Sequence, residues 1–88
     1  VVYIWTMELK NKLRIARLLN GDVTQEQLAR LVGCSRQTIN SVENGKFVPS
    51  IKLVLSIARV LKVPVEEIFF LEETESEWKE NNGRQAGT

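Results

Sequence analysis

A chain of 88 residues forms one small domain, and this one has no apolar run near the roughly 18 residues needed to span a membrane. One cysteine excludes an intrachain disulfide and suits a reducing cytoplasm, while the lack of histidine and of any metal-ligand cluster argues against an enzyme, a metal site or a cofactor. The net charge of +1 combines +6 over residues 1–63 with −5 over residues 64–88, and a basic body suits a polyanionic partner.

Residues 1–6, VVYIWT, are apolar, β-branched and aromatic, which predicts a strand. An exposed apolar strand edge invites association, so we expect the segment to be covered. The only other strand-like run, residues 68–72, is the expected partner. Met7 is an alternative natural start, in which case residues 1–6 are an upstream extension.

Residues 11–19 are predicted to form the first helix. Leu13, Ala16 and either Leu19 or Asn20 recur at helical spacing and indicate its inward face. Arg14 lies on another side of this helix, and residues 20–23 form the loop that follows.

Residues 24–45 indicate two short helices joined by a tight turn. Ala29 is small, as required where two helices crossing at about 90–120° nearly touch. Gly33 ends the first helix at a position where a positive φ is expected. The inward positions at matching spacing are Leu28, Val32, Cys34, Ile39 and Val42, and we interpret Cys34 as a packing residue.

Local capping supports these boundaries. Thr24 and Gln27 predict a capping box at the start of the first of the two helices. Ser35 is the expected N-cap of the second, accepting a hydrogen bond from the amide of Thr38.

The second of these helices, residues 35–44, turns polar side chains outward. Arginine can bond guanine, and glutamine or asparagine can bond adenine, at their edges in the major groove. An ordinary solvated helix face is the alternative interpretation. The outward residues are Arg36, Gln37, Asn40 and Ser41.

Beyond Gly45, which closes this helix, Lys46 is a candidate phosphate contact and Phe47 an expected packing residue. Ser50 caps a predicted helix over residues 51–61, whose apolar stripe indicates core. The stripe comprises Leu53, Val54, Ile57, Ala58 and Leu61. A last short helix begins at Pro64 or Val65.

The end of the chain is polar and acidic, so residues 73–88 are predicted to be a flexible tail. Trp78 is the exception, because a lone tryptophan in such a tail often docks on something. Its target is either the body of the protein or a neighbouring molecule.

Three segments, TQEQLARLVG, SRQTINSVENGK and PSIKLVLSIARVLKVPVEEIF, resemble the Cro/C1-type (Xre) helix-turn-helix family over residues 8–70. The chain looks most like its compact dimeric subgroup, similar to the cytolysin repressor. The resemblance implies an all-α, five-helix lambda-repressor-like DNA-binding domain over residues 1–72. It also implies a small two-stranded antiparallel sheet formed by the N- and C-terminal segments.

The resemblance also implies roles for single residues. Gln25 matches a family glutamine that bonds a DNA phosphate, and Arg17 matches an arginine that pairs with the glutamate of E-N-G, here Glu43. From their place on the reading helix, base contacts are expected from Arg36, Gln37, Asn40 and Ser41, with a phosphate as the alternative partner of Arg36. Further expected phosphate contacts are Ser35, Thr38, Lys46 and Arg14, and a thymine methyl is the alternative partner of Thr38. At the position of Phe47 the family often places an aromatic residue next to the DNA backbone, which is the alternative to packing there.

These features predict a sequence-specific double-stranded DNA-binding regulator in the cytoplasm, a homodimeric repressor reading an inverted repeat with half-sites about 34 Å apart. The expected dimer contacts are Val63, Val65, Ile68, Phe69 and Leu71. The alternative is an antitoxin-type module that binds a partner protein through its acidic C-terminal segment. Catalysis is not expected, because Glu66 and Glu67 are adjacent and do not face each other.

Overall fold

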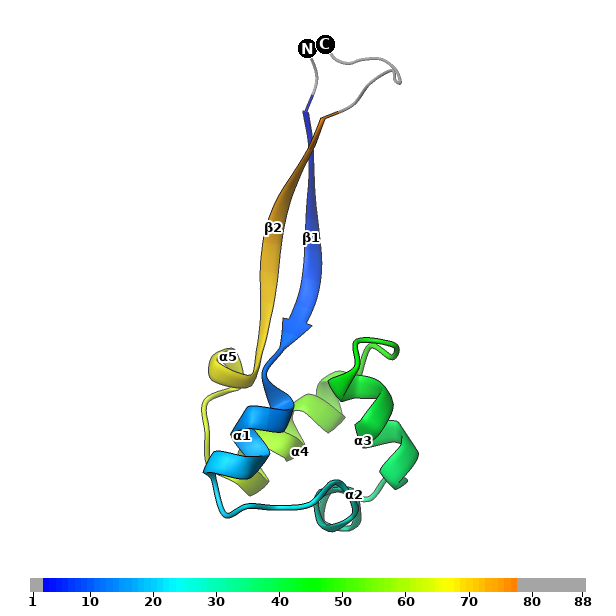
Figure 1. Cartoon of the computed structure of the whole chain (residues 1–88), viewed down its shortest axis with the longest axis vertical. Coiled ribbons are helices and arrows are strands. Elements are labelled where there is room, and N and C mark those ends of the chain that lie inside the picture. The colour runs from blue at the N-terminus through cyan, green and yellow to red at the C-terminus, as the bar shows by residue number, and fades with distance from the viewer. Residues whose placement is uncertain (1–2, 78–88) are drawn as a thin grey trace.

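The protein consists of a helical body and a long two-stranded ribbon that projects from it (Figure 1). The structure, a computed structural model, describes the backbone of residues 3–77 and the side chains of residues 7–73. Its principal extents are 49 × 22 × 20 Å. In chain order the elements are β1 (Tyr3–Asn11), α1 (Leu13–Leu19), α2 (Gln25–Val32), α3 (Arg36–Glu43), α4 (Ile51–Leu61), α5 (Val65–Ile68) and β2 (Phe69–Glu77).

The five helices and the small antiparallel sheet confirm the predicted fold class. The capping box at Thr24 is present, and Ser35 and Ser50 accept from the amides of Thr38 and Leu53. Each cap satisfies an amide that the helix itself leaves without a partner. The three helices therefore begin where the sequence indicates.

Both strands of the ribbon are longer than the predicted ranges, which were residues 1–6 and 68–72. β1 and β2 pair in antiparallel register from Tyr3 opposite Glu77 to Asn11 opposite Phe69. Residues 73–77, assigned by sequence to a flexible tail, thus continue β2 because each has a backbone partner on β1. Trp78 and the remainder of the predicted tail lie outside the described residues.

The first helix starts later than predicted, at Leu13 instead of Asn11. Asn11 is the last residue of β1, and its side chain makes two contacts that set the junction. Its Oδ1 accepts from the amide of Leu13 at 3.0 Å, and its Nδ2 donates to the carbonyl of Val42 at 2.9 Å. The residue therefore joins the base of the ribbon to both α1 and α3.

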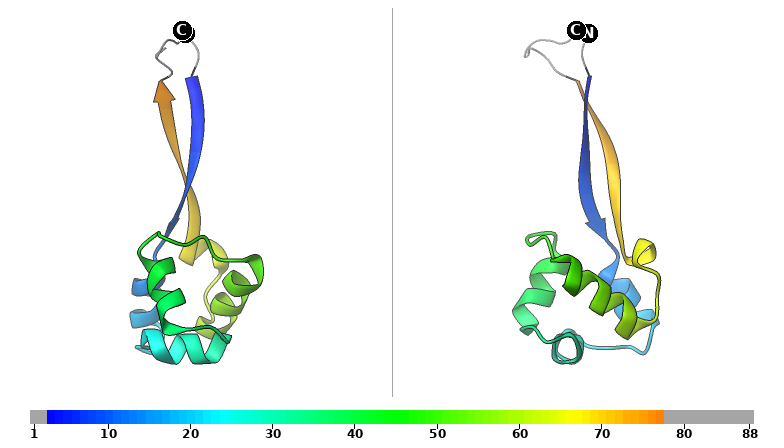
Figure 2. Two further views of the ribbon diagram at one scale, coloured as in Figure 1. Left: turned by 90° about the vertical axis from the view of Figure 1, so that its right-hand side faces the viewer. Right: turned by 180° about the vertical axis from the view of Figure 1, so that it is seen from behind.

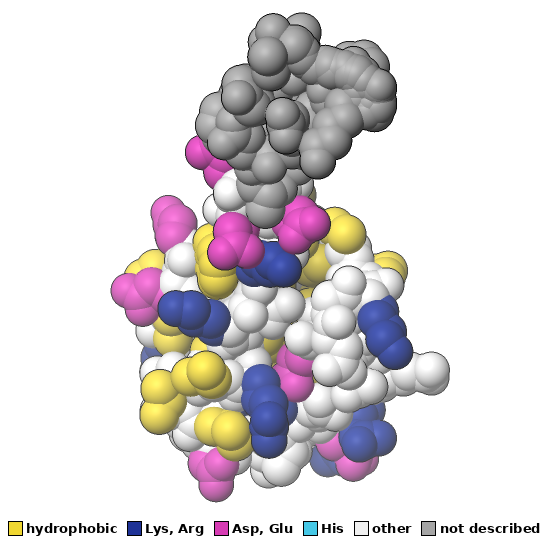
Figure 3. Space-filling model, turned by 45° about the horizontal axis from the view of Figure 1, so that its top comes forward, with side chains coloured by type: hydrophobic (Ala, Val, Ile, Leu, Met, Phe, Trp, Pro, Cys, Tyr) yellow, Lys and Arg dark blue, Asp and Glu magenta, His cyan; other side chains and the backbone are white. Residues whose placement is uncertain are grey.

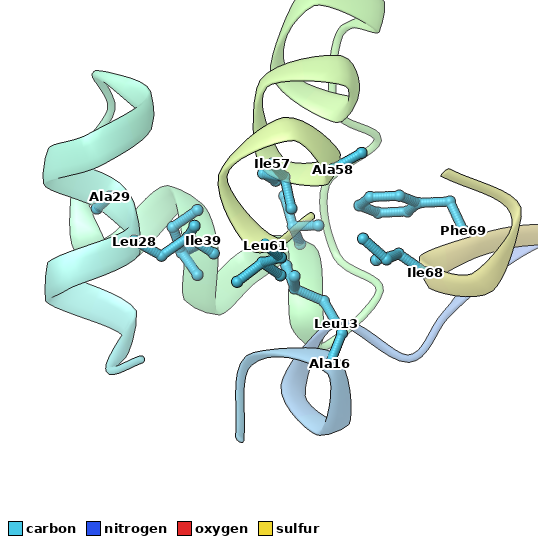
Figure 4. Packing of buried hydrophobic residues seen from close by; sticks show 11 residues of the cluster. Leu13, Ala16, Leu28, Ala29, Ile39, Ile57, Ala58, Leu61, Ile68 and Phe69 are labelled. Atoms are coloured by element: carbon cyan, nitrogen blue, oxygen red, sulfur yellow. The ribbon is translucent and has the colours of Figure 1, made fainter. Parts of the chain in front are cut away.

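One hydrophobic cluster draws on all five helices and the start of β2. Figure 4 shows Leu28 and Ile39 pointing toward each other, with Ile68 and Phe69 turned toward α4. The buried members are Leu13, Ala16, Leu28, Ala29, Ile39, Val42, Ile57, Ala58, Leu61, Ile68 and Phe69.

Three sequence-based assignments are corrected by this core. Ile68 and Phe69, expected at a dimer interface, are 0% and 6% exposed within one protomer because they pack on α4. Leu19 was a candidate for the inward face of α1, but it is exposed where that helix ends. Phe47 was expected to pack, yet it stands half exposed in the loop after α3.

Candidate nucleic-acid interface

The α2–α3 pair is built around a close and steep helix crossing. α2 is seen end-on in Figure 1 while α3 slopes down toward it in the plane of the page, and Figure 2 shows α2 lying across the foot of α3. Ala29 is 2% exposed in this packing, and Gly33 adopts a φ of +81°, which ends α2 as predicted. A non-glycine residue at Gly33 would be strained in that backbone conformation.

The crossing leaves one face of α3 on the surface. Ile39 and Val42 are buried against the core, whereas Arg36, Gln37 and Asn40 are exposed. Ser41, the fourth predicted base-reading residue, is partly buried. The polar face of α3 is therefore held outward by the burial of its apolar face.

Six residues at and after the start of α3 line one hollow of about 320 Å³. Lys46 supplies the positive charge there. Phe47, which sequence reasoning assigned to packing, lies beside it with an exposed ring. The lining residues are Ser35, Gln37, Thr38, Ser41, Lys46 and Phe47.

Two of the three hydroxyl groups that line this hollow, those of Ser35 and Thr38, are linked. Ser35 Oγ accepts from the amide of Thr38, and it lies 2.9 Å from Thr38 Oγ1. One hydroxyl hydrogen is used between these oxygens, so the other is free to donate to an anion. Together with Lys46, this pair could hold a phosphate oxygen.

A second hollow, of about 390 Å³, lies at the start of α2 and contains Gln25 and Arg36. Asp22 and Glu26 also line it, so its charge is mixed, although Glu26 is paired with Arg30 at 3.0 Å. Arg14 is exposed on α1 and lines neither hollow. Arg14 therefore shares neither hollow with the other predicted phosphate contacts.

An ion pair connects α1 to the end of α3. Arg17 Nε donates to Glu43 Oε2, and Arg17 Nη2 donates to Glu43 Oε1 at 3.2 Å. Arg17 Nη1 also donates to the carbonyl of Val23 at 2.7 Å. The predicted pair is present, and the same guanidinium anchors the loop between α1 and α2.

Gln25 extends this network toward the surface. Its Nε2 donates to Glu43 Oε1 at 2.9 Å and to Asn40 Oδ1 at 3.2 Å. Both hydrogens of the amide group are therefore engaged inside the protein. This link was missed from the sequence, because it depends on how α2 crosses α3.

Cys34 lies half-buried between α2 and α3 and packs against the core, as its apolar spacing predicted. Burial raises the pKa of its thiol above the usual value of 9.0. Near neutral pH the group is therefore a protonated packing residue with weak nucleophilicity.

Surface chemistry differs between the two sides of the body. In Figure 3 hydrophobic side chains gather on the left, whereas the right, where α3 lies in Figure 1, is mainly backbone and side chains that are neither charged nor hydrophobic, with Lys and Arg at its margin. Acidic side chains cluster around the base of the ribbon. Within residues 3–77 no helix has the length and apolar character that crossing a bilayer requires.

Comparison with known proteins places this geometry in context. A profile described as helix-turn-helix matches residues 13–68. An uncharacterised HTH-type transcriptional regulator of Methanocaldococcus jannaschii is 48% identical over 67 residues, which is 76% of this chain and 100% of that protein. The uncharacterised HTH-type transcriptional regulator YgzD of Bacillus subtilis is 40% identical over 65 residues, covering 74% and 97% of the two chains. One from Archaeoglobus fulgidus is 48% identical over 54 residues, covering 61% and 76%.

Proposed function

The chain belongs to the Cro/C1-type (Xre) helix-turn-helix family of DNA-binding transcriptional regulators, and from this premise we propose that it is a homodimeric repressor. Each protomer inserts α3 into the major groove of one half of an inverted-repeat operator. The observation that carries the proposal is the exposed polar face of α3, held outward by buried Ile39 and Val42.

Base recognition is assigned to the exposed face. Arg36 and Gln37 lie in the first turn of α3, where side chains reach deepest into the groove. Asn40 and the partly buried Ser41 follow one turn later and meet the next base pairs. Arginine suits guanine, and glutamine suits adenine.

Phosphate contacts are assigned around this face. Lys46 and the free hydroxyl of the Ser35–Thr38 pair hold one phosphate in the hollow that they share. Gln25 meets a second phosphate through backbone amides at the start of α2, because both hydrogens of its side-chain amide are already engaged. Arg14 contributes a further contact along α1.

The proposed operator should emerge from selection of bound sequences among random duplexes. We expect an inverted repeat whose half-site centres lie about 34 Å apart. Affinity for the selected duplex should fall with salt by roughly 0.9 logarithmic units per phosphate neutralised, measured by fluorescence anisotropy. Enrichment of no sequence, or an affinity that does not change with salt, would contradict a DNA-reading role.

The ribbon supplies the proposed dimer surface. One of its faces carries Met7, Leu9 and Leu71, which are respectively 52%, 39% and 59% exposed; Leu9 lies directly opposite Leu71, and Glu73 lies opposite Met7 on the same face. Lys10, on the other face, bridges Glu8 and Glu72. An isolated two-stranded ribbon is marginally stable in water. A second copy presenting the same Met7, Leu9 and Leu71 side chains would stabilise both ribbons through a self-complementary two-fold contact.

Five residues were expected at the dimer interface. Ile68 and Phe69 are buried in the core of their own protomer and Val63 and Val65 are half-buried against it, so Leu71 is the one of the five that is exposed. We therefore expect Leu71→Arg to convert the dimer to monomer in sedimentation equilibrium and to weaken operator binding. The control is Leu19→Arg, which places the same charge on an exposed leucine of α1. An unchanged dimer in Leu71→Arg would remove the ribbon from the interface.

A further inference from the structure

Gln25 connects the buried ion pair to the exposed face of α3. The guanidinium of Arg17 carries only donors, so both oxygens of Glu43 act as acceptors toward it. Glu43 is held with its side chain 5% exposed. The group that Gln25 turns toward Glu43 must therefore be its NH2, as the 2.9 Å distance from Nε2 indicates.

The orientation of Gln25 then dictates that of Asn40. The second hydrogen on Gln25 Nε2 reaches Asn40 Oδ1 at 3.2 Å. Asn40 consequently turns its carbonyl oxygen toward α2, and its NH2 group is the end left for a partner outside the protein. Asn40 itself is exposed on α3.

We propose that Gln25 is a positioning residue that makes Asn40 a hydrogen-bond donor in DNA recognition. This inference rests on the proposed function, because it names the chemistry that one residue of the reading face uses. Guanine presents two acceptors, N7 and O6, in the major groove. Adenine presents one acceptor and one donor, and a paired contact to it needs the Asn40 oxygen that Gln25 holds. Asn40 therefore reads guanine in a G·C pair in preference to adenine.

The test uses sequence selection with the full-length protein and with single variants. Comparing the sequences selected by the wild-type protein and by Asn40→Ala identifies the base pair that Asn40 reads: it is the operator position at which the variant no longer prefers one base pair. We expect that position to be G·C in the wild-type operator. An A·T pair there, or no position affected by Asn40→Ala, would overturn the inference.

Gln25→Met then separates positioning from phosphate binding. The variant removes both donors of the amide, so the Asn40 side chain is free to turn and we expect adenine to be accepted at its position. The comparison is Lys46→Met, which should weaken binding to all sequences without changing any preference. If Gln25→Met instead weakens binding to all sequences without changing any preference, the Gln25 side chain does not position Asn40 and the inference fails.

Asn40→Asp provides a test on the surface, away from the buried ion pair. Aspartate still accepts from Gln25, but at neutral pH it offers no donor to the duplex. We expect it to bind the wild-type operator about 5- to 150-fold more weakly, the range for loss of one good base contact. Undiminished affinity for that operator would show that the outward group is not a donor. A wild-type protein that selects no sequence at all would instead refute the proposed function.

Discussion

The double variant Arg36→Ala, Gln37→Ala is expected to bind its operator little better than random DNA. Both side chains are exposed in the first turn of α3 and neither belongs to the core, so the fold should persist. Each base contact contributes about 1–3 kcal/mol, and the pair therefore accounts for much of the roughly 4–10 kcal/mol that separates specific from non-specific binding. The measurement is the ratio of dissociation constants for operator and scrambled duplexes at one salt concentration.

Part of any loss of affinity in the double variant will come from removing the positive charge of Arg36 near DNA. Arg59→Ala removes the same charge from an exposed position on α4 and should leave the specificity ratio unchanged. Thermal unfolding of each variant checks that the fold is intact. A double variant that retains the wild-type ratio would mean that the reading face is assigned to the wrong residues.

Replacing Arg17 by methionine is expected to lower the free energy of unfolding by about 3–5 kcal/mol, the usual cost of removing one member of a buried ion pair. The side chains of Arg17 and Glu43 are 8% and 5% exposed, so Glu43 would keep a buried charge without its cation. The carbonyl of Val23 would also lose its donor. Urea denaturation followed by circular dichroism measures the change.

The exposed pair between Arg30 and Glu26 offers a matched control. Its side chains are 75% and 65% exposed, and Arg30→Met should change the unfolding free energy by only about 0.3–0.5 kcal/mol. If Arg17→Met proves no more destabilising than Arg30→Met, the pair with Glu43 is not an important source of stability. The same measurement on Glu43→Gln tests the pair from its other side.

The helix-turn-helix was predictable because its signals are local. The capping box at Thr24, the serine cap at Ser35 and the positive φ of Gly33 each depend on residues within four positions along the chain. The pairing of Arg17 with Glu43 was different in kind. It came from the resemblance to a family, because nothing in the spacing of two residues 26 positions apart indicates that they meet.

The outer part of the ribbon could not be predicted from local sequence signals. The outer part of β2 alternates glutamate with Thr74 and Ser76, a pattern that by composition resembles a solvated tail. Its strand character comes from the register with β1, which gives every residue from Phe69 to Glu77 a backbone partner. Pairing between segments more than 55 residues apart is not encoded in either segment alone.

The sequence by itself determined where the helices of the reading unit begin, which faces are apolar, and which polar residues lie on α3. Only the tertiary structure decided that Ile68 and Phe69 serve the core of their own protomer and that Gln25 bonds to Asn40. The physical reason is range: caps and turns act between neighbouring residues, whereas burial is non-directional and assigns an apolar residue to core or interface only after the helices are packed. The Gln25–Asn40 bond likewise exists because α2 and α3 cross closely over Ala29.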